Sequence, residues 1–185
     1  PSGTVRINAP GPAADHVLCP LAFEFMEIYP DINVEIVSEA AIIDIVEHGF
    51  DAGVRFGHQL AQDMIAMPLG PALQYAIVAS PDYLRRRGRP GSPDDLLTHD
   101  CIRRRFPGGT MVMWKFANNG NEVEITPKGR LTLSSAHQER QAALAGSGIA
   151  HLFDDYVRKD VRQGRLVELL VDWKKKLPSW YLYYP

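Results

Sequence analysis

Cysteine is scarce in this chain, and the two cysteines present form no pattern of a metal or redox site. Cys19 and Cys101 are far apart and lack Cys-x-x-Cys spacing, which is typical of zinc sites and thiol redox motifs. Buried free thiols are the usual state of cysteine in a reducing cytoplasm. We therefore expect a cytoplasmic protein whose cysteines are free.

Long apolar runs and a strong net charge are absent as well. No segment approaches the roughly 20 apolar residues that a membrane span needs, and the N-terminus has no signal pattern. The net charge of −2 and the pI near 6.3 argue against a dedicated nucleic-acid surface. The basic runs at 85–87, 103–105 and 174–176 are interpreted as solvated edges and helix ends. We expect no membrane contact, and no DNA binding by this chain itself.

Catalytic signatures are missing too. The sequence has no nucleophile elbow, P-loop, dinucleotide fingerprint or carboxylate pair placed for acid–base chemistry. Its 6 histidines are scattered, without the His-x-x-x-His spacing of a helical metal site. The sequence therefore predicts no enzyme, no cofactor and no metal.

What is present is an ordinary globular composition, 45% apolar and 23% charged, arranged as alternating strands and helices. In the first part of the chain, alternation predicts strands and helical spacing predicts helices. In chain order, the predicted elements are strand Thr4–Ala9, helix Ala13–Tyr29, strand Asn33–Val37, helix Ile42–His48 and strand Asp51–Arg55. This order predicts an open, mostly parallel sheet covered by helices.

A second β/α set follows Pro81. Its predicted elements are a helix at 82–87, a strand near 101–104, a hairpin that pairs 114–116 with 123–125, a strand at 130–134, a helix through Gln141 and a strand at 149–153. Asn119-Gly120 is the expected hairpin turn. Ser134 or Ser135 is expected to cap the helix through Gln141, and Gly146 to end it. The last strand, 181–184, is expected to return to the first set. The predicted fold class is α/β, with two Rossmann-like β/α lobes joined by a hinge.

Several short motifs follow one another in a fixed order. They are Gly49-Phe50-Asp51-Ala52-Gly53-Val54-Arg55-Phe56-Gly57, Met67-Pro68-Leu69, Ala79-Ser80-Pro81-Asp82-Tyr83-Leu84, His99-Asp100-Cys101-Ile102, Gly146-Ser147-Gly148-Ile149-Ala150, Gly164-Arg165-Leu166-Val167 and Tyr181-Leu182-Tyr183-Tyr184-Pro185. Together they resemble the effector-binding half of LysR-type transcriptional regulators, in particular the CrgA-like group, over residues 3–185.

The resemblance implies a fold like the type 2 periplasmic binding proteins, with lobe I at 1–79 plus 181–185, lobe II at 80–180 and a small-molecule effector in the central cleft. It also implies a homodimer, a tetramer in the full-length protein, and DNA binding only through an N-terminal winged helix-turn-helix domain that is absent from this chain. Family members generally continue past Tyr184 into a final helix, so we expect a trimmed domain. The alternative is a periplasmic-type solute-binding protein, which shares the two-lobe logic; the ordered motifs favour the regulator.

Effector contacts are expected beyond the carboxyl ends of the strands, where helix starts offer free N–H groups. The candidates are Pro10, Gly11, Pro12, Ala40, Ala41, Arg55, Phe56 and Gly57 in the first lobe, and Arg103, Ser134, Ser135 and His137 in the second. An organic acid or aromatic metabolite is the expected ligand. The family commonly places Ser or Thr at the first two strand ends. The residues 10–12 and 40–41 depart from that habit, which favours binding through backbone amides or a less anionic effector.

Each candidate also has a simpler interpretation. Arg55 is a natural partner for a carboxylate, but an arginine solvated at a sheet edge is the open alternative. For Ser134, Ser135 and His137 the alternative is a plain helix cap, and for Arg103 it is a solvated side chain.

Overall fold

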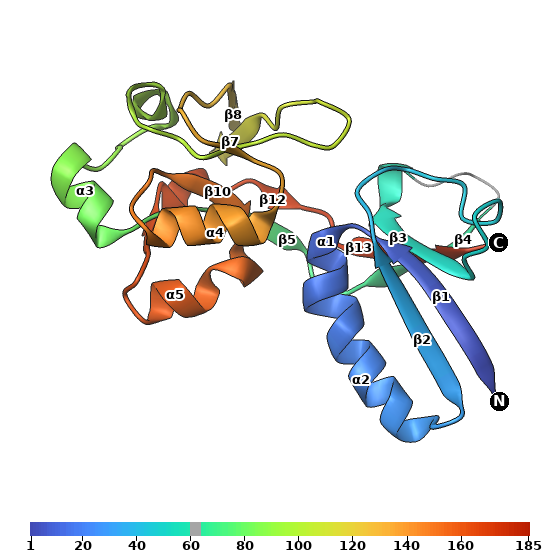
Figure 1. Cartoon of the computed structure of the whole chain (residues 1–185). Coiled ribbons are helices and arrows are strands. Elements are labelled where there is room, and N and C mark those ends of the chain that lie inside the picture. Colours follow the sequence, from blue (N-terminus) through green and yellow to red (C-terminus); the bar gives the residue numbers. More distant parts are fainter. Residues whose placement is uncertain (60–63) are drawn as a thin grey trace. The chain divides into compact units, whose positions relative to one another are not determined.

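The chain forms two compact units in a computed structural model that describes residues 1–59 and 64–185 (Figure 1). Unit 1 comprises Pro1–Ala72 and Leu177–Pro185, and unit 2 comprises Leu73–Lys176. The short strand β12 (Lys176–Leu177) spans the second boundary. Within the described residues, no helix is both long and apolar enough to cross a membrane.

Unit 1 is built on a five-stranded sheet in the order β2-β1-β3-β13-β4. Its strands are β1 (Gly3–Ala9), β2 (Ile32–Ser38), β3 (Ala52–Phe56), β4 (Ile65–Leu69) and β13 (Trp180–Tyr184). The three strands β2, β1 and β3 are parallel, which confirms the predicted βαβ order, whereas β13 runs antiparallel to β3 and β4. The end of the chain therefore returns to the first sheet, as predicted.

One long helical segment follows β1 and lies along β2 (Figure 1). It consists of α1 (Gly11–Ala13), a π-helical stretch (Ala14–Leu18) and α2 (Cys19–Ile28). Pro20 has no N–H and its ring clashes with a regular helical turn. The wider turn just before it, in which the Cys19 N–H donates to the Ala14 carbonyl, lets the helix continue through this proline. The predicted helix Ala13–Tyr29 is confirmed, with its start at Gly11.

The predicted helix Ile42–His48 is wrong. The structure has a single hydrogen-bonded turn at residues 45–49, because the Asp44 carboxylate caps the N–H groups of Val46 and Glu47 and Gly49 ends the turn at φ +68°. Only Ile45 is buried, whereas Ile42 and Val46 are more than half exposed. The Asp44 cap and the terminating Gly49 are only five residues apart, and a segment of that length is too short to form a stable helix.

Unit 2 has β5 (Leu73–Ala79) at the centre of its main sheet, antiparallel to both β10 (Ala150–Phe153) and β11 (Val167–Leu169). The short strands β6 (Arg103–Arg104) and β9 (Thr132–Leu133) are parallel. The predicted hairpin is confirmed as β7 (Trp114–Asn118) and β8 (Asn121–Ile125). Its turn places Asn119 and Gly120 at positive φ, as a two-residue hairpin turn requires.

The helices of unit 2 are α3 (Pro81–Arg87), α4 (Ala136–Leu144) and α5 (Arg158–Arg162), with 3₁₀ turns at Pro93–Thr98, Asp154–Tyr156 and Val171–Trp173; unit 1 has one at Gly57–Gln59. The core is aromatic and aliphatic, with Tyr83, Trp114 and Phe116 almost fully buried. The segments around Gly148 and Asp100 pack closely against each other. A Cβ on Gly148 would lie 2.3 Å from the Asp100 carbonyl oxygen, so this strand start admits only glycine.

Candidate functional site

A buried arginine marks the carboxyl ends of the parallel strands in unit 1. Arg55 on β3 is 2% exposed. Its Nη2 donates to the Asn8 side-chain oxygen at 2.5 Å and to the Ala41 carbonyl at 2.6 Å, and its Nη1 donates to the Val54 carbonyl at 2.7 Å. The arginine thus joins the ends of β1 and β3 to the segment after β2.

Strand register brings the partners of Arg55 together. Asn8 on β1 is opposite Gly53 on β3, and Gly53 is opposite Tyr183 on β13. A Cβ on Gly53 would meet the Tyr183 ring at 2.5 Å, so the missing side chain is what lets this ring lie against the sheet. Asn8, Tyr183 and Arg55 therefore share one face, because Arg55 is two residues along the strand from Gly53.

The charge of Arg55 has no counter-ion among the described residues, since no carboxylate there lies within 4 Å of the guanidinium. Burial lowers the pKa of Arg55, against smaller opposing effects of Tyr183 and Glu39. The Arg55 Nε and the Asn8 Nδ2 are buried without a hydrogen-bond partner. An arginine has five N–H donors and Asn two, so this cluster holds unused donors and an uncompensated positive charge.

The other unit 1 candidates lie on both sides of this cluster. Pro10 begins the helical segment without a side-chain cap, and its carbonyl accepts the N–H groups of Ala13 and Ala14. Since Pro12 has no N–H, Gly11 is the backbone donor that this helix start can offer. Ala41 contacts Arg55 directly through its carbonyl, and exposed Ala40 precedes it.

Phe56 and Gly57 serve packing. The Phe56 ring stacks on Trp180 at 4.2 Å between centroids. A Cβ on Gly57 would lie 3.1 Å from the Tyr181 ring. Both residues tie β3 to β13 and so fix the strand that carries Arg55.

Three of the unit 2 candidates, Ser134, Ser135 and His137, lie between the carboxyl end of β9 and the first turn of α4, and the fourth, Arg103, lies beside the first residue of β9. Arg103 on β6 is opposite Thr132, and its Nε is buried without a partner. Ser135 is the N-cap residue of α4, but its side chain makes no capping hydrogen bond, so the predicted position is confirmed and the predicted bond is not. Ser134 and His137 are exposed, and the His137 ring meets Tyr156 edge-on at 5.1 Å.

Two site residues escaped the sequence reasoning, Asn8 and Tyr183. Asn8 is a polar residue at 0% exposure directly before the Ala9-Pro10 turn, and a polar position at the buried end of an alternating strand is the signal that identifies it. Tyr183 is in the C-terminal motif, but its strand partner Gly53 is 130 residues earlier in the chain, so a local sequence pattern cannot reveal the contact. In the described part of the chain, no group of three or more His, Cys, Asp or Glu could hold a metal ion.

Comparison with known proteins places this geometry in a family. The model of the LysR substrate binding domain matches residues 1–185. The transcriptional regulator YcaN of Escherichia coli (strain K12) is 39% identical over 100% of this chain and 60% of its own length. The regulator CrgA of Neisseria meningitidis serogroup C is 33% identical over 93% of this chain and 56% of its own length.

Solved structures agree. The structure of CrgA from Neisseria meningitidis has a TM-score of 0.83 at 31% identity, covering 100% of this chain and 62% of that chain. The chain thus spans about three-fifths of the length of these relatives. The predicted α/β fold with periplasmic-binding-protein-like lobes is confirmed. With a family model matched along its whole length, the chain belongs to the LysR substrate-binding domain family, and CrgA is among its relatives.

Proposed function

We propose that this chain is the effector-sensing and self-associating domain of a LysR-type transcriptional regulator, and that it binds a small organic acid through Arg55. Units 1 and 2 are the two lobes in this proposal. DNA binding is assigned to a separate winged helix-turn-helix domain of the parent protein. The observation that carries the proposal is the buried guanidinium of Arg55, which has neutral partners only.

The chemistry of Arg55 selects the ligand class. A buried cation without a counter-ion is unfavourable in the free protein, and a carboxylate that enters beside it restores charge balance and accepts the unused N–H donors. Asn8 adds a second donor through its free Nδ2. The Gly11 N–H at the helix start offers a third. Together these groups replace the side-chain hydroxyls that residues 10–12 and 40–41 lack.

Exposed apolar side chains on α2 support self-association. Leu21, Phe23 and Ile28 are 47%, 64% and 69% exposed, and no residue of α2 is buried. Leu21 and Ile28 are seven residues apart and share one face of the helix, whereas Phe23 lies on the opposite face. Exposed apolar side chains on a helix face are typical of protein interfaces. Ligand binding then acts on the regulator by favouring one conformation of the domain, to the extent that the ligand binds the two conformations with different affinity.

The test is thermal and urea unfolding of this chain with a panel of small aliphatic and aromatic carboxylic acids. A ligand at about 100 times its Kd adds roughly 2.7 kcal/mol to the free energy of unfolding. We expect a selective shift for one chemical class, lost in Arg55→Gln.

The matched control is Arg6→Gln, the same change at the other arginine of the unit, which pairs with Glu35 on the same sheet. Arg6→Gln is expected to keep the ligand-induced shift. If no acid shifts the folded protein, or if both variants lose the shift equally, Arg55 is not an effector anchor.

A further inference from the structure

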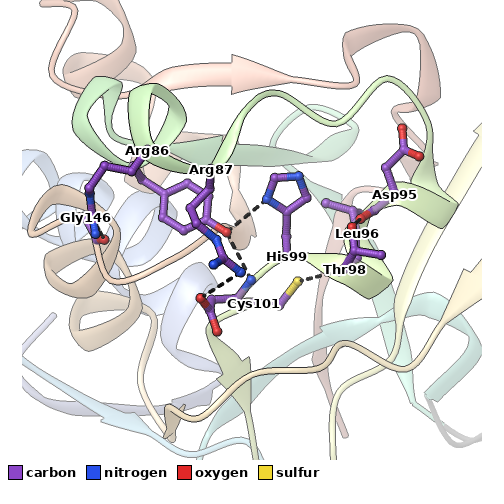
Figure 2. Close-up of polar contacts among 10 residues, drawn as sticks. Arg86, Arg87, Asp95, Leu96, Thr98, His99, Cys101 and Gly146 are labelled. Atoms are coloured by element: carbon purple, nitrogen blue, oxygen red, sulfur yellow. Dashed lines mark hydrogen bonds and ion pairs between the residues drawn. The ribbon is translucent and has the colours of Figure 1, made fainter.

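Unit 2 contains a cavity whose wall carries three arginines, and none of the candidate effector contacts is part of that wall. Its volume is about 500 Å³, and its wall includes Tyr83, Arg86, Arg87, Asp100, Arg130 and Gly146. Cavities that hold small metabolites measure about 300–1,000 Å³. Figure 2 shows Arg86 and Arg87 at the end of α3, with Gly146 on one side and Cys101 below.

This cavity lies at the opposite end of the local elements from Ser134, Ser135 and His137. Arg103 is the candidate beside it, since its backbone N–H donates to the Leu131 carbonyl in the wall. Arg130 and Leu131 precede β9, whereas Ser134 and Ser135 follow it. Gly146 follows the end of α4, whereas Ser135 precedes its start. A nine-residue helix rises about 13 Å. The cavity, at the amino end of β9, is therefore separate from the candidates at the start of α4.

The charges of the wall are unbalanced. Three arginines face one carboxylate, Asp100. Arg86 donates to the Gly146 carbonyl at 2.8 Å. This bond satisfies one N–H of the guanidinium but does not neutralise its positive charge. Arg87 is 3.5 Å from Asp100, with both side chains partly exposed. Arg130 is exposed and makes no hydrogen bond or ion pair with any described residue.

The polar groups between the arginines are fixed and neutral. The Tyr83 hydroxyl accepts the Asp100 N–H at 3.0 Å and meets His99 Nδ1 at 3.0 Å (Figure 2). Burial raises the pKa of the Cys101 thiol to about 12 and also raises the pKa of Tyr83. Neither group adds a negative charge at neutral pH, so Asp100 is the one carboxylate of the wall against three arginines and the cavity keeps an excess of positive charge.

We propose that this cavity binds a small polyanion, a phosphate ester or a polycarboxylate, held by Arg87 and Arg130 with Arg86 beside them. Guanidinium groups bind both phosphate and carboxylate oxygens in bidentate geometry. Asp100 competes with the anion for Arg87. The cavity is an anion site in addition to the one proposed at Arg55.

The test titrates pyrophosphate and citrate separately into ¹⁵N-labelled protein at constant ionic strength, and follows the amide signals of Gly146 and Ser147. Saturable shifts at these amides are expected for at least one probe, and the tighter probe identifies the class of anion. Arg130→Gln removes an exposed, unpaired charge and is expected to weaken binding about tenfold without affecting folding. Asp100→Asn is expected to tighten binding severalfold, because it removes the competing carboxylate.

Lys128→Gln is the matched control, since it removes the same charge from an exposed side chain of the same segment outside the cavity wall. Its affinity should stay within twofold of the unmodified protein. The proposal is overturned if neither probe gives saturable shifts at these amides, if Lys128→Gln weakens binding as much as Arg130→Gln, or if Asp100→Asn weakens it.

Discussion

Arg55 in unit 1 is buried and Arg104 in unit 2 is largely buried, and the two arginines differ in what balances their charge. The Arg104 side chain on β6 is 14% exposed and binds both carboxylate oxygens of Glu139, a residue of α4 at 1% exposure. Arg55 on β3 is 2% exposed and contacts only the neutral oxygens of Asn8, Ala41 and Val54. One charge is neutralised within the chain and the other is not.

The difference separates an arginine that is paired within the fold from the one that we propose as the ligand anchor. A buried ion pair compensates desolvation only when both partners are present and well oriented. The Arg104–Glu139 pair meets that condition and holds α4 against β6. Arg55 lacks an internal counter-ion and keeps unused donors, which is the state expected of a group that waits for an anionic ligand.

Glu139→Gln should have the largest effect on stability. It keeps the shape of the side chain but leaves Arg104 buried without a counter-ion, which typically lowers the free energy of unfolding by about 3–5 kcal/mol. Urea unfolding measures the loss. The control is Glu124→Gln, which breaks the exposed Lys115–Glu124 pair and should change stability by about 1 kcal/mol at most. Similar losses in both variants would show that the Arg104 pair is not special.

The sequence names Arg55 as a candidate contact, but it gives no sign of the Arg104–Glu139 pair, for a physical reason. Arg55 belongs to a run of nine residues that also carries the strand and the family resemblance. Arg104 and Glu139 are 35 residues apart, in a strand of two residues and a helix whose other polar residues are mostly exposed. Nothing local distinguishes Glu139 from its solvated neighbours; only the tertiary contact does.

Local signals succeeded where the backbone demanded a particular residue. Asn119-Gly120 predicted the β7–β8 turn because both positions take positive φ. The predicted Ile42–His48 helix is wrong because the Asp44 carboxylate caps the segment only five residues before Gly49 ends it, which leaves room for one turn. The prediction that Ser135 caps α4 is right about the N-cap position and wrong about the hydrogen bond. The sequence indicates where the helix starts, whereas the orientation of the hydroxyl depends on its tertiary surroundings.

His151 allows a second test with a smaller expected effect, because it is a buried titratable group whose ring nitrogens have no hydrogen-bond partner. Its ring lies between Tyr75 and Trp114 at 4.1 and 5.2 Å, and both ring nitrogens lack hydrogen-bond partners. Burial, with a smaller effect of Arg104, lowers the pKa of His151 to about 3 from an ordinary value of 6.5. Below pH 6.5 the unfolded chain therefore binds a proton that the folded chain does not.

The stability of the protein should fall through this group as the pH drops from 6.5 toward 3, by about 1.4 kcal/mol per pH unit. His151→Phe keeps the ring stack and removes the proton site, so its unfolding free energy should fall less steeply over that window. Urea unfolding at several pH values measures both slopes. The exposed His48→Gln variant should retain the slope of the unmodified protein, and a parallel fall in His151→Phe would contradict the assignment.

Arg55→Met should have the smallest effect on stability and the largest on binding. Removing the guanidinium leaves the Asn8 and Ala41 oxygens without a donor, a loss of about 1–3 kcal/mol, and at the same time relieves an uncompensated buried charge. The two terms oppose each other, so we expect a net change within about 2 kcal/mol, smaller than that of Glu139→Gln. Urea unfolding without ligand measures it. If Arg55→Met loses as much stability as Glu139→Gln, Arg55 is a structural residue like Arg104. If Arg55→Met unfolds nearly as the unmodified protein does but is no longer stabilised by the acid, Arg55 serves ligand binding and contributes little to the stability of the fold.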